Sequence, residues 1–171
     1  MSSKKFQEPK ALTGVAAFHH LFGMPVLDNP EIPAKKRCEL RISLLQEELD
    51  ELKEAIEDND IVEIADALAD LQYVLSGAVL EFGLGDKFKT LFDEVQRSNM
   101  SKACATQEEA EATQEYYRQH RDTESEVKPA DGKFLVYRKG DGKVLKSVNY
   151  SPADLRSIVE DEVSEAFNID S

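Results

Sequence analysis

Residues 35–58 read KKRCELRISLLQEELDELKEAIED, and residues 61–82 read IVEIADALADLQYVLSGAVLEF. In both stretches apolar side chains recur at steps of three or four, which is the spacing of one face of an α-helix. Only Asn59 and Asp60, both turn formers, separate the two stretches. Because so short a break favours antiparallel neighbours, the sequence predicts two long helices packed against each other.

Acidic side chains follow the same helical period in both stretches. They are Glu47, Glu48, Asp50, Glu51, Glu63, Asp66 and Asp70. Antiparallel packing would turn the two acidic stripes toward one small volume. Like charges gathered there repel one another, and a divalent cation relieves that repulsion. Carboxylate oxygens suit Mg²⁺, with a nucleoside triphosphate supplying the remaining ligands, so metal and substrate are expected to bind together.

A solvated surface is the ordinary interpretation of an acidic helix face. The second stripe argues against it, because Asp66 and Asp70 stand among apolar residues throughout 64–71. Carboxylates are rarely placed in such surroundings without a partner. The metal neutralises charge on the scissile phosphates and lowers the pKa of a bound water, which a carboxylate can orient or deprotonate. The predicted chemistry is therefore Mg²⁺-dependent cleavage of a nucleotide, with Mn²⁺ as a substitute.

Residues 47–51, EELDE, and residues 63–66, EIAD, together resemble the EExxE and ExxD pair of the MazG-like all-α nucleotide pyrophosphohydrolases. Phosphoribosyl-ATP pyrophosphohydrolase and dimeric dUTPase belong to the same superfamily. The resemblance extends over residues 15–105 and includes ALADLQYV at 67–74 and RSNMSK at 97–102. It implies a helical core that pairs with another subunit, bound Mg²⁺, and release of pyrophosphate from a nucleotide.

The resemblance also assigns site residues. The candidates are Glu47, Glu48 and Glu51 as catalytic residues, Glu48, Glu51, Glu63, Asp66 and Asp70 as metal ligands, and Asn99 and Lys102 as substrate-binding residues. Lys146 is added to the substrate-binding residues from its own position, on the expected ribbon with Tyr150 nearby. In some relatives the motif aspartate directly precedes a Leu-x-Tyr segment, which here selects Asp70 and puts Ala67 where a glutamate is expected. We favour Glu63 with Asp66 and keep Asp70 as a nearby member.

The substrate-binding candidates have simpler interpretations as well. A lysine such as Lys102 meets phosphate as a point charge, and the Asn99 amide can bond sugar or base. Lys102 is equally suited to the carbonyl groups at a helix end, and Asn99 to a C-cap. For Lys146, on an expected ribbon, a solvated surface lysine is the commoner role. His19 and His20, which are adjacent in the sequence, lack a third partner at metal-ligand spacing. Phe18 and Phe22, on the same segment, belong to the core or lie beside a base.

Other segments complete a mostly helical expectation. Further helices are predicted over 15–23, from an Asp86 N-cap to 99–100, over 106–121 with a Thr106 capping box, and from a Ser151 N-cap to Val163. A hairpin is predicted between 133–138 and 144–146, while 122–131 reads as turns. The fold class is a MazG-like bundle of about four core helices with a small β-hairpin and a final helix. Domains are expected at 1–121 (catalytic) and 122–171 (appendage).

Composition restricts the partners. The net charge of −13, from 34 acidic and 21 basic residues, excludes a non-specific binder of nucleic acid polymers or anionic membranes. Cys38 and Cys104 form no CxxC pair, so neither a disulfide framework nor a thiolate zinc site is expected. The sequence shows neither the apolar stretch of a signal peptide nor an apolar run long enough for a membrane-spanning helix, so a cytoplasmic location is expected. Helices apolar round most of their surface predict a homodimer or homotetramer.

Several functions fit these observations. A house-cleaning pyrophosphohydrolase of NTPs or dNTPs is preferred, because the C-terminal ribbon and helix are extra to the minimal helical domain. Phosphoribosyl-ATP hydrolysis in histidine biosynthesis is the alternative within the enzyme class. A non-enzymatic acidic helical interaction protein is the alternative of another class, and it would have no reason to place Asp66 and Asp70 among apolar residues.

Overall fold

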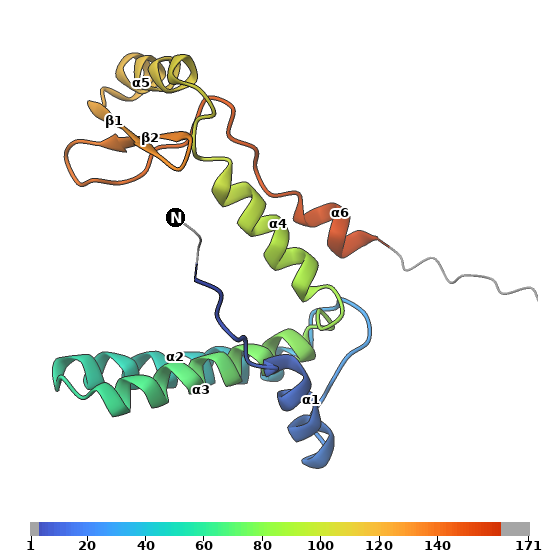
Figure 1. Ribbon diagram of the computed structural model, residues 1–171. Coiled ribbons are helices and arrows are strands. Elements are labelled where there is room, and N and C mark those ends of the chain that lie inside the picture. The colour runs from blue at the N-terminus through green and yellow to red at the C-terminus, as the bar shows by residue number, and fades with distance from the viewer. Residues whose placement is uncertain (1–3, 162–171) are drawn as a thin grey trace, which may run out of the picture. The chain divides into compact units, whose positions relative to one another are not determined.

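Figure 1 shows the computed structural model, which describes residues 4–161. The described chain is mostly helical and carries one small antiparallel two-stranded sheet, which confirms the predicted fold class. The elements are α1 (Ala11–Leu21), α2 (Lys35–Glu57), α3 (Ile61–Glu81), α4 (Phe88–Met100), α5 (Gln107–Arg121), β1 (Ser125–Ala130), β2 (Lys133–Arg138) and α6 (Leu155–Glu160). Two compact units contain them: residues 4–88, here the helical unit, and residues 89–161, here the ribbon unit.

The helical unit is built on the antiparallel pair α2 and α3, with α1 packed against α3 (Figure 1). Asn59 turns the chain between the two long helices in a left-handed conformation, with φ of 55°. The Asp60 carboxylate then caps α3 by accepting from the backbone N–H groups of Val62 (2.9 Å) and Glu63 (3.2 Å). Both long helices therefore lie where the apolar period predicts them.

A polar network occupies the middle of the helical unit. Glu81 is fully buried and accepts from Arg37 and from Arg41 Nε, the latter at 2.7 Å. The buried His19 lies 3.4 Å from Arg41 through Nε2, and its Nδ1 donates to the Pro25 carbonyl at 2.8 Å. Burial acts to raise the pKa of Glu81, but the hydrogen bonds and charges of the two arginines outweigh it and lower that pKa. In this part of α1, the core position considered for Phe18 and Phe22 is thus occupied by His19.

The ribbon unit has an apolar core between α5 and the sheet. Its members are Cys104, Ala110, Val136 and Leu145, with Tyr117, Val127 and Phe134 packed around them. Thr106 caps α5 as predicted, accepting from the Glu109 N–H at 3.2 Å. The Glu109 carboxylate, however, reaches back to the N–H of Ala105 rather than to that of Thr106. The capping-box prediction is therefore confirmed for one of its two bonds.

The sheet differs from the predicted hairpin. Strand β2 lies where expected, but its partner is β1, in the segment 125–130 that reads as turns, and Asp131-Gly132 forms the connection with positive φ at both residues. Val144 forms only an isolated bridge with Tyr137. The charged side chains of the short edge strand β1 conceal its alternation, so the turn signal at Gly140–Gly142 is the stronger one in the sequence.

Helix starts also need correction. The N-cap of α6 is Asp154, which accepts from the Ser157 N–H, and not Ser151. Ser151 is instead held by Arg97, whose guanidinium also donates to the Pro152 carbonyl at 3.1 Å. In the same way α4 begins at Phe88 rather than at an Asp86 cap, and α1 begins four residues before Val15. The predicted extension of α6 to Val163 lies outside the described residues.

The division between the units falls at residue 88, earlier than the boundary at 121 expected from the sequence. Helix α5 belongs with the sheet because it packs against both strands, and α4 joins the same unit because residues 151–154 are hydrogen-bonded along it. Its Tyr117 hydroxyl accepts from the Lys146 N–H at 3.2 Å, and Gln114 donates to the Ser125 carbonyl at 2.9 Å. Helix α5 is therefore part of the ribbon unit.

Candidate functional site

Glu48 is the central member of the predicted acidic site. It lies on α2, its side chain is partly buried, and Oε2 is shielded from solvent with no hydrogen-bond donor among the described residues. Burial is the largest cause of a raised pKa at Glu48, and the charges of Asp70, Glu51, Glu47 and Asp66 raise it further. Because two of these acids come from α3, the acidic stripes of both helices act on one carboxylate.

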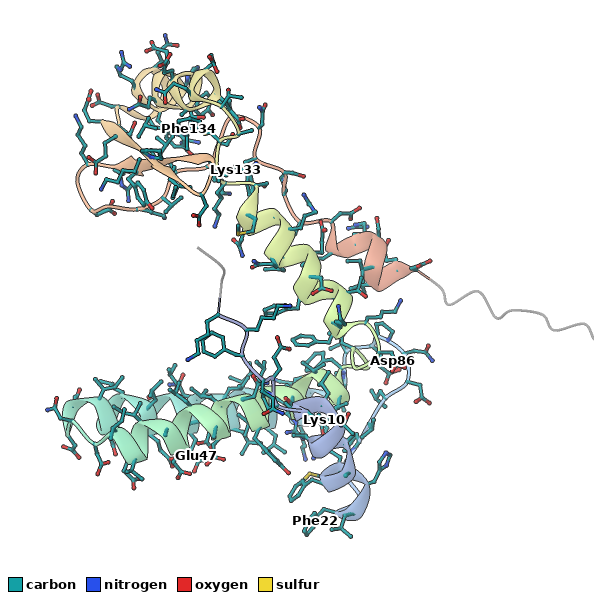
Figure 2. All side chains as sticks on the ribbon, viewed as in Figure 1. Lys10, Phe22, Glu47, Asp86, Lys133 and Phe134 are labelled. Atoms are coloured by element: carbon teal, nitrogen blue, oxygen red, sulfur yellow. The ribbon has the colours of Figure 1, made fainter. Side chains whose placement is uncertain are left out.

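Four other acids act on Glu48 from exposed positions, namely Glu47, Glu51, Asp66 and Asp70. Glu47 and Glu51 also line a groove along α2 together with Asp50. Figure 2 labels Glu47 on the helix pair, where many of the surrounding side chains end in oxygen atoms. Asp66 and Asp70 lie on α3 and are exposed in the single chain, so the expectation that apolar neighbours enclose them is wrong there.

The register of α3 explains this exposure. Ala67 is buried and Ile64 half-buried, whereas Leu68 is 52% exposed, so the inward face of α3 is narrower than its apolar sequence suggests. Glu63 stands in the first exposed turn of α3, and its charge is not among those that raise the pKa of Glu48. The charges of Asp66 and Asp70 both raise the pKa of Glu48, and that of Asp70 raises it more. The structure therefore rejects neither Asp66 nor Asp70 as the motif aspartate.

The donor set fits a divalent cation, although it is not a closed cage. Within residues 4–161, no three acidic, histidine or cysteine side chains already lie close enough together to hold a metal ion. Oε2 of Glu48 is nonetheless buried without a hydrogen-bond donor, and the negative charges of four carboxylates act on Glu48. A hard cation would supply the positive charge that this oxygen lacks. Glu48 would be the central ligand, joined by the acids nearest to it. Exposed carboxylates can turn toward a cation because their rotamers are not fixed by packing.

An apolar groove of about 530 Å³ lies between α1 and α3. It is lined by Leu68, Ala69, Gln72 and Tyr73, which flank Asp70 in the sequence, and by the start of α1 from Pro9 to Val15. At its side the Tyr73 ring meets that of Phe18 edge-on, with centroids 5.8 Å apart. An aromatic wall beside acidic residues suits a planar apolar group that carries phosphates.

The predicted substrate-binding residues gather in the ribbon unit. The Lys102 ammonium donates to Asn99 Oδ1 at 2.8 Å rather than to carbonyl groups at the end of α4. The Lys146 ammonium lies 4.3 Å from the centre of the Tyr150 ring. A hydrogen bond from Ser98 is the largest cause of a lowered pKa at Tyr150, and the charges of Lys146 and Lys102 lower it further. The structure therefore brings the two lysines to one tyrosine.

Sequence reasoning placed Tyr150 near Lys146 but missed Ser98 and its hydrogen bond to Tyr150. Tyr150 stands beyond the predicted ribbon, and nothing in the local pattern ties it to α4. The one available signal is that both residues lie close to assigned lysines along the chain, Ser98 to Lys102 and Tyr150 to Lys146. That signal is too general to assign a contact across so many intervening residues.

A helix pair whose acidic stripes act on a common carboxylate is the arrangement implied for an all-α nucleotide pyrophosphohydrolase. Residues 15–99 match the family model for phosphoribosyl-ATP pyrophosphohydrolase. That family belongs to the MazG-like nucleoside triphosphate pyrophosphohydrolase superfamily, so the match confirms the predicted resemblance over these residues. No curated protein matches the chain. Among the described residues, no helix has both the length and the apolar character needed to span a membrane.

Proposed function

We propose that this protein is a Mg²⁺-dependent nucleotide pyrophosphohydrolase that cleaves an NTP or dNTP to the monophosphate and pyrophosphate. The observation that carries the proposal is the buried Oε2 of Glu48, which has no donor among the described residues and lies within the field of acids from both α2 and α3. Such an arrangement destabilises the folded chain unless a cation is bound. The match of residues 15–99 to a pyrophosphohydrolase family model supports the same conclusion.

Each acid has a proposed role. Glu48, Glu51, Glu63, Asp66 and Asp70 are the proposed ligands of Mg²⁺, for which Mn²⁺ would substitute. When bound, the metal would neutralise charge on the scissile phosphates and acidify a coordinated water. Glu47, Glu48 and Glu51 are the proposed catalytic residues, one of which orients that water or accepts its proton. The raised pKa of Glu48 belongs to the metal-free chain, and a bound cation would lower it and keep the carboxylate ionised.

Substrate contacts are proposed at two places. Asn99, Lys102 and Lys146 are the proposed substrate-binding residues, since their amide and ammonium groups gather near Tyr150. The apolar groove beside Tyr73 supports a role for α1 and α3 in holding the base. Its lining offers few polar atoms with which to distinguish one base from another, which favours a broad house-cleaning activity over a single nucleotide.

Phosphoribosyl-ATP is the second candidate substrate, and the matched family model names it. Phosphoribosyl-ATP carries a triphosphate chain, as NTPs and dNTPs do, so the acidic site suits both kinds of substrate equally. A purely structural acidic protein is the remaining alternative, and it predicts no metal-dependent activity.

A homodimer or homotetramer is also proposed. Several large apolar side chains on α2 and α3 are more than half exposed in the single chain, namely Ile42, Ile56, Ile61, Val62 and Leu68. A monomer rarely leaves so much apolar surface to water. Light scattering after gel filtration measures the number of copies, and a monomeric peak contradicts this part of the proposal.

The decisive experiment is a panel of nucleotides, including phosphoribosyl-ATP, assayed for pyrophosphate release with Mg²⁺ and with EDTA. Glu48→Gln should abolish release, while Glu57→Gln, at the exposed end of the same helix, should not. Release from NTPs or dNTPs alone would support the preferred function, and release from phosphoribosyl-ATP alone the alternative. A folded protein that releases pyrophosphate from none of them with Mg²⁺ or Mn²⁺ is not this enzyme.

A further inference from the structure

Lys102 and Lys146 are distant in sequence but adjacent in the ribbon unit. The Ser147 N–H donates to the Lys102 carbonyl at 3.1 Å, so the chain between these residues leaves α4 and returns to the same point. The Tyr117 hydroxyl holds the Lys146 N–H at 3.2 Å. Backbone bonds at both positions therefore fix where the two ammonium groups can reach.

The segment 147–154 then runs along α4 and holds Tyr150 in place. The Ser151 N–H donates to Ser101 Oγ at 2.9 Å, and the Asp154 N–H donates to Glu94 Oε1 at 2.8 Å. Arg97 donates to Ser151 Oγ at 3.0 Å. These bonds follow Tyr150 in the chain and the bond from Ser147 to Lys102 precedes it, so its hydroxyl stays beside α4 and near both lysines.

The polarity of the Tyr150 hydroxyl suits an anion. Ser98, which is buried, donates its hydroxyl hydrogen to the Tyr150 oxygen at 3.1 Å. The Tyr150 oxygen is thus an acceptor in this bond, and its own hydrogen is directed to another group. Its lowered pKa makes it a stronger donor. Asn99 accepts from Lys102 through Oδ1, which turns its amide N–H₂ away from that lysine.

The neighbouring acids do not neutralise this cluster. Glu94 accepts from Nε and Nη2 of Arg97, and its pKa is lowered to about 2, led by the hydrogen bond from Arg97. Glu109 accepts from Ser147 and from the Ala105 N–H. Within residues 4–161, neither Lys102 nor Lys146 forms an ion pair with a carboxylate. Two cations and a phenolic donor therefore point to one multiply charged oxyanion.

We propose that Lys102, Lys146 and Tyr150 form a binding site for a pyrophosphate group, either as the free product or as the end of a nucleotide triphosphate chain. Two ammonium groups match the charge of pyrophosphate better than that of a carboxylate, and the tyrosine adds a directed hydrogen bond. The inference rests on the proposed function only for the identity of the ligand. All three side chains belong to the ribbon unit, so binding there requires no metal.

Titration of the full-length chain with inorganic pyrophosphate in EDTA, followed by calorimetry, tests the site. Without a metal the acidic stripes repel the anion, so this measurement reports on the lysine cluster. Lys146→Gln and Lys102→Gln should each weaken the Kd roughly fivefold, and Tyr150→Phe roughly threefold. Lys139→Gln removes the same charge from an exposed position in the same unit and should leave the Kd unchanged.

Tyrosine fluorescence gives a second readout, because the protein has five tyrosines and no tryptophan. Pyrophosphate should change this emission in the original chain and not in Tyr150→Phe. Lys146→Gln should weaken the Kd for pyrophosphate and the Kd for a non-hydrolysable triphosphate by the same factor, which identifies a shared site. It should leave the Kd for AMP unchanged. Equal dependence for AMP would overturn the pyrophosphate assignment in favour of a single phosphate.

The two proposals fail in different ways. Absence of pyrophosphate binding, or equal loss in Lys139→Gln and Lys146→Gln, overturns the lysine site even when nucleotides are hydrolysed. Binding that depends on Lys146 in a chain that hydrolyses no nucleotide sustains the site and overturns the enzyme.

Discussion

Arg41 Nε donates to Glu81 Oε2 at 2.7 Å inside the helical unit. Arg41 lies in the first half of α2 and Glu81 is the last residue of α3, so this buried pair fixes how far the antiparallel helices slide past each other. That register also sets which acids of α3 come within range of Glu48. Arg37 binds the same carboxylate, so a single negative charge serves two cations.

Replacement of Glu81 should therefore destabilise the fold severely. Glu81→Gln leaves a buried guanidinium without its counter-charge, and we expect a loss of about 3–5 kcal/mol in the free energy of unfolding measured with urea. The matched control is Glu39→Gln on α2, which breaks only the exposed pair with Lys35 and should cost less than about 0.5 kcal/mol. Equal losses in the two variants would contradict the buried pair.

The pH dependence of stability should carry the signature of Glu81. Its pKa is lowered in the folded chain relative to the ordinary value of 4.5, so the unfolded chain binds a proton more readily. The contribution of Glu81 is thus complete above about pH 4.5 and is lost as the pH falls toward the folded pKa. Unfolding midpoints measured across the acid range should fall more steeply in the original chain than in Glu81→Gln.

Gly77 should tolerate no side chain, because a Cβ there would lie 2.7 Å from Arg41 Nη1 and 3.1 Å from His19 Nε2. Both atoms are held in the buried network, so we expect Gly77→Ala to cost about 1–3 kcal/mol by overpacking. Gly14→Ala is the control, since it lies in α1 with nothing within 4 Å of the added atom. It should stabilise the protein by about 0.5–1 kcal/mol through helix propensity. Thermal melts that order the two variants the other way would reject the packing described here.

The contribution of Glu48 to stability should change with pH in the opposite direction to that of Glu81. Its folded pKa is raised above 4.5 by burial and by neighbouring acids, so the folded chain holds the proton more tightly than the unfolded chain. In EDTA, stability should therefore decline as the pH rises from about 4.5 through the folded pKa, and Glu48→Gln should remove this decline. Mg²⁺ should raise the melting temperature of the original chain at neutral pH and have little effect on the variant. A melting temperature that is independent of both pH and Glu48 would argue that the carboxylate is simply solvated.

Ser98 should control the ionisation of Tyr150. Its hydrogen bond is the largest cause of the lowered pKa, ahead of the two lysine charges. Ser98→Ala should therefore raise the pKa of Tyr150, and Lys146→Gln, which removes both a charge and a hydrogen bond, should raise it as well. Ultraviolet titration of the tyrosinate band, with Tyr150→Phe subtracted to isolate the residue, measures both shifts. No change in Ser98→Ala would mean that the hydroxyl is not bonded in solution.

The sequence predicts the long helices well because their apolar period and the Asp60 cap act locally. The acids on them were also recognisable, since their spacing on two adjacent helices brings them within range of Glu48. The degree of burial was not predictable in the same way. An apolar helix buries only the face that meets a neighbour, and in the single chain Leu68 remains half exposed beside Asp66 and Asp70.

Predictions that depended on long-range contacts were the ones that failed. Strand β1 forms because β2 offers it a partner, and its own residues, including Pro129, give little β signal. The N-cap of α6 moved from Ser151 to Asp154 because Arg97, far earlier in the chain, binds Ser151. Likewise, Tyr150 joins the lysine cluster through Ser98 on α4, a contact that no local pattern records.

The backbone bond between Lys102 and Ser147 closes the excursion through α5 and the sheet at its base. Helix α5 also holds the returning segment, because the Tyr117 hydroxyl accepts from the Lys146 N–H and the Thr113 hydroxyl from the Val148 N–H. Helix α5 and the ribbon thus act as a brace for Lys146, so natural variation or an engineered graft can change their outer surfaces but not the face that bonds residues 145–148.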